Sequence, residues 1–214
     1  MERTAVTVEA VREVGRDTVA LELKTPEAFD ALPGQFVLVR ATPDGADEEV
    51  ARHYTLSSPD VEDTFEITVA VDPDGDLTPW LAARQPGDEI DVEGPFGEIT
   101  YHRDRDVVAV AGGPGVGPAV GIGEAARDAG YEVAIVYQDD EPAHEDRLEA
   151  LAADGADLTI VDDGDDEALA AAVGEHVDDG QLYAFGFKDF VFAVRDAIEE
   201  AGGDPDEALI ENFG

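Results

Sequence analysis

Hydrophobic and polar positions alternate in short runs over residues 1–102. These runs are rich in β-branched residues, and turn signals such as Pro33-Gly34 and Pro73-Asp74-Gly75 separate them. We expect strands over Thr4–Val11, Thr18–Leu23, Gln35–Ala41, His53–Ser57, Phe65–Val71 and Glu89–Glu93. Six short strands divided by turns are typical of an antiparallel β-barrel.

The pattern changes near residue 103, where apolar strands begin to alternate with segments of helical periodicity. Strands are expected over Val107–Ala111, Glu132–Tyr137, Leu158–Val161 and Leu182–Phe185, and helices over Val116–Ala129, Ala143–Ala153, Glu167–Val177 and Phe190–Ala201. This alternation predicts a parallel sheet flanked by helices. The expected fold is therefore two domains, an N-terminal antiparallel six-stranded β-barrel over 1–102 and a C-terminal α/β parallel-sheet domain over 103–214, joined at His102–Asp106.

The net charge changes the expected setting of this fold. Lys and Arg number 13 against 52 Asp and Glu, so the formal charge is 13 − 52 = −39. The acid is spread along the chain, with 23 carboxylates in 1–102 and 29 in 103–214, and 43% of residues are hydrophobic, so we expect a folded chain with an acidic surface. We interpret this surface as halophilic, because molar salt screens charges beyond about 3 Å. An acidic protein from an ordinary cytoplasm is the alternative. Either surface argues against nucleic acid or an anionic membrane as a partner.

Cysteine is absent, which excludes disulfides, a thiol nucleophile and a cysteine-ligated iron–sulfur cluster within this chain. The four histidines lack ligand spacing, so no metal site is expected. No apolar run approaches a membrane span, and the first residues lack a signal-peptide core. We therefore expect a cytoplasmic protein without membrane insertion.

The segment Arg52-His53-Tyr54-Thr55-Leu56-Ser57-Ser58 carries the first candidate chemistry. Side chains alternate along a strand, so Arg52 and Tyr54 should share a face. A guanidinium suits a phosphate, a ring can stack on a flat cofactor, and the Thr55 hydroxyl can bond a ring nitrogen. Such a strand alone is more often an ordinary half-exposed surface.

Three further motifs follow in order: Gly94-Pro95-Phe96-Gly97, the glycine-rich turn Gly112-Gly113-Pro114-Gly115-Val116-Gly117-Pro118, and the tail Glu211-Asn212-Phe213-Gly214. With the Arg52 segment, their order and spacing resemble the ferredoxin–NADP reductase superfamily across essentially the whole chain. The resemblance implies that the barrel binds FAD and that the α/β domain binds a nicotinamide dinucleotide. No metal is implied.

The resemblance assigns roles to residues of the barrel. Arg52 would face the flavin pyrophosphate, Tyr54 would stack along the ring or ribityl chain, and Thr55 would bond the ring near its reactive nitrogen, with Leu56 beside them. His53 would point away. Gly94 and Gly97 would form the exit turn of the barrel. A predicted helix start would contribute backbone N–H groups and a hydroxyl that bind phosphate. The helix-start residues are Gly75, Asp76, Leu77 and Thr78.

The α/β domain would hold the nicotinamide cofactor in a strand–turn–helix context, where small residues allow close approach of a pyrophosphate. The expected contacts are Gly112, Gly113, Gly115, Val116, Gly117 and Pro118. Two positions depart from the family. Pro114 replaces the usual threonine, and Phe185, before Gly186, replaces the expected cysteine beside the nicotinamide, where a bulky ring would obstruct that cofactor or hold it differently.

The tail and one loop complete the expected site. Glu211 would relay protons or help to hold the geometry that faces a partner, and Phe213 would cover the flavin face. We therefore take Thr55 and Glu211 as the catalytic residues; a plain edge strand is the alternative for this tail. Asp139 and Asp140 follow the strand that, by the resemblance, ends near the adenosine ribose, and one of the two would lie nearest to it. A carboxylate there repels a 2′-phosphate and accepts a bond from a free hydroxyl. NADH is therefore expected over NADPH, with Arg147 the one nearby cation that could accommodate NADPH.

The sequence thus predicts an FAD-dependent oxidoreductase that moves hydride from NAD(P)H to flavin and passes electrons to a separate acceptor, a ferredoxin-like protein or a small molecule. The alternative is a non-catalytic flavin-binding electron-transfer subunit or regulator with impaired nicotinamide binding, which Pro114 and Phe185 favour.

Overall fold

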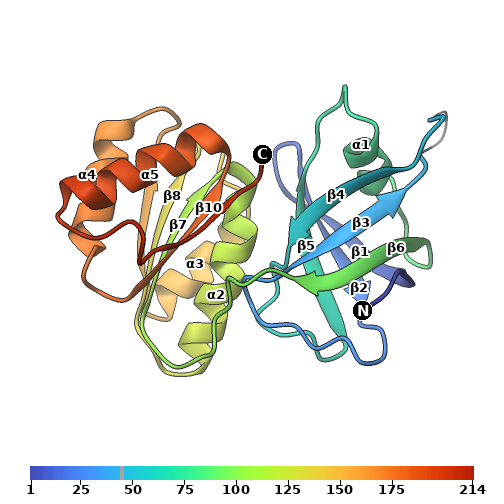
Figure 1. Ribbon diagram of the computed structural model, residues 1–214, viewed down its shortest axis with the longest axis horizontal. Coiled ribbons are helices and arrows are strands. Elements are labelled where there is room, and N and C mark those ends of the chain that lie inside the picture. The colour runs from blue at the N-terminus through green and yellow to red at the C-terminus, as the bar shows by residue number, and fades with distance from the viewer. Residues whose placement is uncertain (44–45) are drawn as a thin grey trace.

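The first sheet of the computed structural model, which describes residues 1–43 and 46–214, is a six-stranded antiparallel barrel (Figure 1). Its strands are β1 (Thr4–Gly15), β2 (Thr18–Lys24), β3 (Phe36–Ala41), β4 (Val50–Thr55), β5 (Thr64–Ala70) and β6 (Glu89–Phe96), in the order β4-β3-β6-β1-β2-β5. Leu56 bridges to Ile67, and the Ser57 N–H donates to the Glu66 carbonyl oxygen over 2.8 Å, so the two edge strands meet and partly close the barrel.

Three strands of the barrel differ from the sequence expectation by more than one residue at an end. β1 continues to Gly15, because it pairs with β2 up to a tight turn at Asp17. β4 begins at Val50 and ends at Thr55, because Leu56 and Ser57 leave β3 and turn toward β5. β6 extends to Phe96, since its last residues still pair with β3. These differences move ends only, and the predicted barrel is confirmed.

The second sheet is parallel, as predicted, in the order β11-β10-β7-β8-β9. Its strands are β7 (Val107–Gly112), β8 (Val133–Gln138), β9 (Asp157–Val161), β10 (Gln181–Gly186) and β11 (Leu209–Asn212). β11 is an edge strand of this sheet, as the alternative interpretation of the tail predicted, and it contains Glu211. Because the strands of this sheet are parallel, their carboxyl ends lie at one edge. The C-terminus lies between the two domains (Figure 1).

Helices cover both faces of this sheet. α2 (Val116–Asp128) and α3 (Glu145–Ala153) pack on one face, and α4 (Asp166–His176) and α5 (Lys188–Glu200) pack on the other. The short turn η1 (Gly113–Gly115) precedes α2, which lies on the side facing the barrel (Figure 1). α3 begins two residues later than expected, since His144 adopts a left-handed conformation with φ of 56°. In the barrel domain, α1 (Leu77–Ala82) follows β5.

The two domains pack directly against each other. A Cβ at Gly121 of α2 would stand 2.9 Å from the Ser57 backbone. Arg103 donates to the carbonyl oxygens of Pro59 and Ala125, and so ties the joining segment to both domains. Within the described residues, no helix has both the length and the apolar character to span a bilayer.

Candidate functional site

A cavity of about 250 Å³ lies where the barrel meets the carboxyl ends of the parallel strands. β4 and β5 supply one wall, α1 and the first turn of α2 supply another, and the segments after β10 and β11 close it. Its lining residues are Arg52, His53, Tyr54, Thr55, Thr68, Ala70, Thr78, Pro114, Pro118, Phe187 and Phe213. The structure therefore brings the Arg52 segment, the glycine-rich turn and the C-terminal tail to one place.

Both faces of β4 border this cavity. Arg52 and Tyr54 pair with Val39 and Val37, so they do share a face, as the alternation predicted. His53 lies on the other face and stacks edge-on against Phe36 with ring centroids 5.0 Å apart. The expectation that His53 points away is wrong, because β4 is an edge strand and the cavity reaches around it.

Arg52 and Tyr54 have the properties that a phosphate and a flat ring require. The Arg52 guanidinium is exposed and donates to the Ala51 carbonyl oxygen, and no carboxylate of residues 1–43 or 46–214 pairs with it. Its charge is thus available to an anion. Burial raises the pKa of Tyr54 to about 12, so its phenol is neutral and presents a ring and a hydroxyl.

Thr55 and Glu211 meet across the domain boundary. The Thr55 hydroxyl donates to a Glu211 carboxylate oxygen over 3.1 Å. Burial raises the pKa of Glu211 to about 7, although the bond from Thr55 opposes the shift. A carboxyl group that titrates near neutrality can both hold and release a proton, which suits a proton relay.

The helix-start segment supplies one residue to the cavity, Thr78. Its hydroxyl accepts from the Asp72 N–H over 3.0 Å and donates to the Asp72 carbonyl oxygen, and the Gly75 N–H donates to the same oxygen. Leu77 is buried in the barrel core, and neither Gly75 nor Asp76 lines the cavity. The expectation of free backbone N–H groups is therefore wrong at Gly75, where the turn uses its donor.

Three other barrel residues serve the fold and do not line the cavity. Leu56 is 1% exposed in the barrel core, and its N–H donates to the Gln35 carbonyl oxygen. Gly94 and Gly97 pack against Phe36, where a Cβ would come within 3.2 Å and 3.0 Å of it. Their predicted role as direct contacts is thus replaced by close packing of the exit turn on β3.

The glycine-rich turn divides into residues that pack and residues that face open space. Three glycines of the turn leave no room for a side chain. A Cβ at Gly112 would overlap the Phe190 ring, and a Cβ at Gly115 would overlap the Phe185 carbonyl oxygen. A Cβ at Gly117 would overlap the Thr68 hydroxyl. Val116 is fully buried. Gly113, with φ of 53°, has nothing within 4 Å of a Cβ, and Pro114 and Pro118 line the cavity. Among the glycines of this turn, Gly113 is therefore the one whose backbone faces open space.

Phe185 does not obstruct the cavity. Its ring is 0% exposed in the core beneath α2, so the expectation of an obstructing ring is wrong. The aromatic wall is instead Phe187, 54% exposed, which meets Phe213 edge-on with centroids 6.0 Å apart. The Phe213 N–H donates to the Gly186 carbonyl oxygen and fixes the tail there.

Asp139 and Arg147 lie outside the cavity lining. The Asp139 carboxylate, just after β8, accepts from the Tyr137 hydroxyl and from the Glu141 N–H. Arg147 pairs with Glu66 and Glu124 and also donates to the Ser57 carbonyl oxygen. Arg147 is therefore committed to the domain interface and is not the free cation that the sequence suggested.

Sequence reasoning missed Thr68, Ala70 and Phe187. Thr68 and Ala70 are two positions apart on β5, so the alternation that singled out Arg52 and Tyr54 on β4 applied equally to them. Phe187 directly follows Gly186, and nothing in the sequence marked it. The signal for a binding surface is the exposure of its large ring, which only the structure shows.

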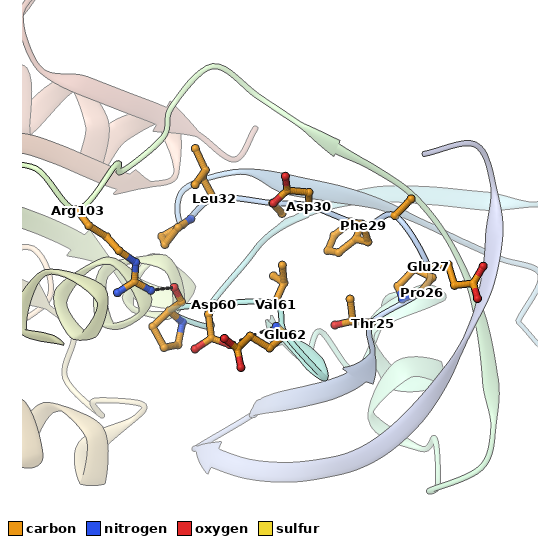
Figure 2. A pocket seen from close by; sticks show the side chains of 14 residues that line it. Thr25, Pro26, Glu27, Phe29, Asp30, Leu32, Asp60, Val61, Glu62 and Arg103 are labelled. Atoms are coloured by element: carbon orange, nitrogen blue, oxygen red, sulfur yellow. Dashed lines mark hydrogen bonds between the residues drawn. The ribbon is translucent and has the colours of Figure 1, made fainter. Parts of the chain in front are cut away.

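A larger cavity, of about 630 Å³, lies elsewhere in the barrel domain (Figure 2). It is formed by residues 25–33 and 59–62 together with Arg103, whose guanidinium is bonded to the Pro59 carbonyl oxygen. Carboxylates surround an apolar centre, and none of the residues singled out from the sequence lines it. Volume therefore does not identify the site, whereas convergence of the motifs does.

Comparisons with known proteins agree with this geometry. Residues 5–101 match the family described as the oxidoreductase FAD-binding domain. The glycine betaine monooxygenase reductase subunit of Chromohalobacter salexigens is 44% identical over 98 residues, 44% of this chain and 26% of that protein. NADH-cytochrome b5 reductase 1 of Aspergillus oryzae is 30% identical over 116 residues, 51% of this chain and 40% of that protein. The chain thus spans less than half the length of these two curated relatives.

A solved structure extends the likeness to both domains. The flavohem-like FAD/NAD-binding domain of nitric oxide dioxygenase from Vibrio cholerae superposes with a TM-score of 0.82 at 21% identity, over 98% of each chain. This likeness shows that the two-domain arrangement is a known fold.

Proposed function

We propose that this chain, a member of the ferredoxin–NADP reductase superfamily, is an FAD-dependent oxidoreductase that takes hydride from NAD(P)H and passes electrons to a separate acceptor. The observation that carries the proposal is the cavity at the domain junction, where the Arg52 guanidinium, the Tyr54 ring and the Thr55–Glu211 pair converge. We place the domain boundary between residues 102 and 103, in the segment between β6 and β7.

The lining residues fit a flavin. The Arg52 charge offers an anion site, and the Tyr54 ring offers a flat apolar surface that ends in a hydroxyl. FAD, when bound, supplies the redox chemistry, and the protein supplies position and electrostatics. Glu211, partly buried and bonded to the lining residue Thr55, would hold or release a proton beside the cavity.

The second domain fits a nicotinamide dinucleotide. A glycine with open space at Gly113 precedes the 13-residue helix α2, whose N-terminal N–H groups and dipole favour a pyrophosphate. We assign that phosphate site to the turn Gly112–Pro118. Asp139, at the carboxyl end of β8, would accept a bond from a ribose hydroxyl and disfavour a 2′-phosphate, which supports NADH.

The acceptor is proposed as a separate ferredoxin-like protein or a small molecule. One relative is named as the reductase subunit of a monooxygenase and another as a cytochrome b5 reductase, so electron delivery to a partner suits this family. The acidic surface supports a cytoplasm of high salt as the setting.

One observation favours the second candidate, a flavoprotein that does not react with nicotinamides. Pro114 lines the cavity and has no N–H to offer a cofactor. This candidate binds FAD as tightly as the first and differs only in the response to NADH.

Titration of the FAD-loaded protein with NADH in molar KCl, without oxygen, tests the proposal. We expect the visible absorbance of the flavin to bleach as NADH is added. Uptake of FAD without bleaching by NADH or NADPH would support the second candidate, and failure to take up FAD would overturn both.

A further inference from the structure

Three threonines line the cavity, and the hydroxyl of each has a different partner. Thr55 donates to Glu211, and Thr78 exchanges bonds with the Asp72 backbone. Thr68, on β5 and 6% exposed, has its hydroxyl 2.8 Å from Nε2 of His144. Thr68 is thus a barrel residue whose orientation is set from the other domain.

His144 is itself held firmly. It is 4% exposed, immediately precedes α3, and its backbone N–H donates to the Val14 carbonyl oxygen of the barrel over 2.7 Å. Burial, with the nearby Arg147 and Arg12, lowers the pKa of His144 to about 3. The ring is therefore neutral near pH 7, and its Nε2 forms one bond with Thr68 as either donor or acceptor.

A hydroxyl can donate once and accept twice, so this single bond leaves Thr68 further capacity. If Nε2 accepts from Thr68, the Thr68 oxygen can still accept a bond from the cavity. If Nε2 donates, the Thr68 hydroxyl hydrogen remains free for the cavity. In both arrangements the ring of His144 fixes where the remaining bond can point.

The first turn of α2 also packs closely against the Thr68 side chain. A Cβ at Gly117 would stand 2.5 Å from the Thr68 hydroxyl oxygen and 3.2 Å from Cβ of Ser57. Only glycine therefore lets α2 approach this closely. Thr68 is enclosed by α2 and by His144, both from the α/β domain, and it also lines the cavity.

We propose that Thr68 bonds the polar edge of the bound flavin ring system and that His144 is the positioning residue that orients this hydroxyl. The inference rests on the proposed function and extends it, because it makes the packing of the α/β domain a determinant of the environment of the flavin. A purely structural bond between domains would have no effect on the flavin.

The test compares the variants Thr68→Val and His144→Leu with the control Thr64→Val. Thr64 is on the same strand, and its hydroxyl bonds Glu22 away from the cavity. The readouts are the Kd for FAD from quenching of its fluorescence, the position of the visible absorbance bands of the bound flavin, and the Tm of each apoprotein in molar KCl. Wild-type protein that takes up no FAD would refute the proposed function before any variant is compared.

We expect Thr68→Val to raise the Kd for FAD roughly five- to tenfold and to shift the absorbance bands, as loss of one hydrogen bond predicts. His144→Leu should change both in the same direction, and the double variant should add little to Thr68→Val, because the two residues act through one bond. Thr64→Val should change neither. If Thr68→Val does not fold, His144→Leu still tests the inference. An unchanged Kd and unchanged bands in the folded variants, with only Tm lowered, would overturn it.

Discussion

Thr55 and Glu211, which are 156 positions apart in sequence, form a 3.1 Å hydrogen bond at the wall of the domain-junction cavity. Thr55 ends β4 of the barrel, and Glu211 lies on β11, the edge strand of the parallel sheet. The catalytic pair proposed here therefore exists only when both domains are folded and packed.

Glu211 should make stability depend on pH near neutrality. Its pKa is raised from 4.5 to about 7, so the folded state binds the proton more tightly than the unfolded state does. The associated stability is present below pH 4.5 and is lost as pH rises through 7. We expect the Tm difference between Glu211→Gln and wild type to grow in favour of the variant from pH 5 to pH 8 at fixed salt. A constant difference would show that Glu211 is not buried as an acid.

Glu211→Gln should also lower the rate of electron transfer to an acceptor while leaving FAD bound, because an amide cannot relay a proton. Stopped-flow traces at several pH values measure this rate. We expect an inflection near pH 7 in wild type and none in the variant; an inflection retained in the variant would assign the proton step to another group.

Arg52→Ala should weaken FAD binding more than His53→Ala. A bond from a guanidinium to a phosphate contributes about 1.5–3 kcal/mol, which corresponds to a roughly ten- to hundredfold change in Kd. His53 also lines the cavity but packs against Phe36, so its removal should have a smaller effect. Fluorescence quenching of FAD measures both, and equal losses would contradict the assignment of Arg52 to the phosphate.

Molar KCl should raise the Tm of the protein. With a formal charge of −39, self-repulsion opposes the compact state in dilute buffer, and salt screens it. Melting curves from low to molar KCl test this expectation. A Tm that does not change with salt would remove the argument for a halophilic surface.

Arg147→Ala should destabilise the domain interface strongly. Arg147 pairs with Glu66 and Glu124, and its removal leaves partly buried carboxylates without a partner, which costs about 3–5 kcal/mol. Arg16→Ala is the matched control, because its exposed pair with Glu141 also joins the two domains but contributes only about 0–1 kcal/mol. Urea unfolding in molar KCl gives the free energy of unfolding of both variants. Similar losses of this free energy in Arg147→Ala and Arg16→Ala would show that the Arg147 ion pairs are not specially stabilising.

NADH should be preferred over NADPH. Asp139 places a carboxylate beside the expected ribose position, and Arg147, the cation that could have neutralised a 2′-phosphate, is held in the domain interface. Steady-state kinetics with both cofactors in molar KCl give the comparison. A higher kcat/KM for NADPH would show that Asp139 does not lie at the ribose.

The sequence by itself determined the two fold types and the order of the motifs, because alternation with period two and strand–helix alternation are local properties of the chain. Through the family resemblance it also singled out Arg52, Tyr54, Thr55 and Glu211 as candidates, since these residue types stand in a recognisable order. The ends of the strands depend on tertiary contacts. The end of β4, for example, depends on Leu56 bridging to β5, which is a contact between strands distant in sequence.

Only the tertiary structure decided which candidates face the cavity. Phe185 and Phe187 are equally apolar and only two positions apart in sequence, yet the first is buried beneath α2 and the second lines the cavity. Gly113 and Gly117 belong to one glycine-rich motif, but Gly113 faces open space and Gly117 packs against the Thr68 side chain. Direction and packing across a domain interface arise from contacts between distant segments, so no local pattern encodes them.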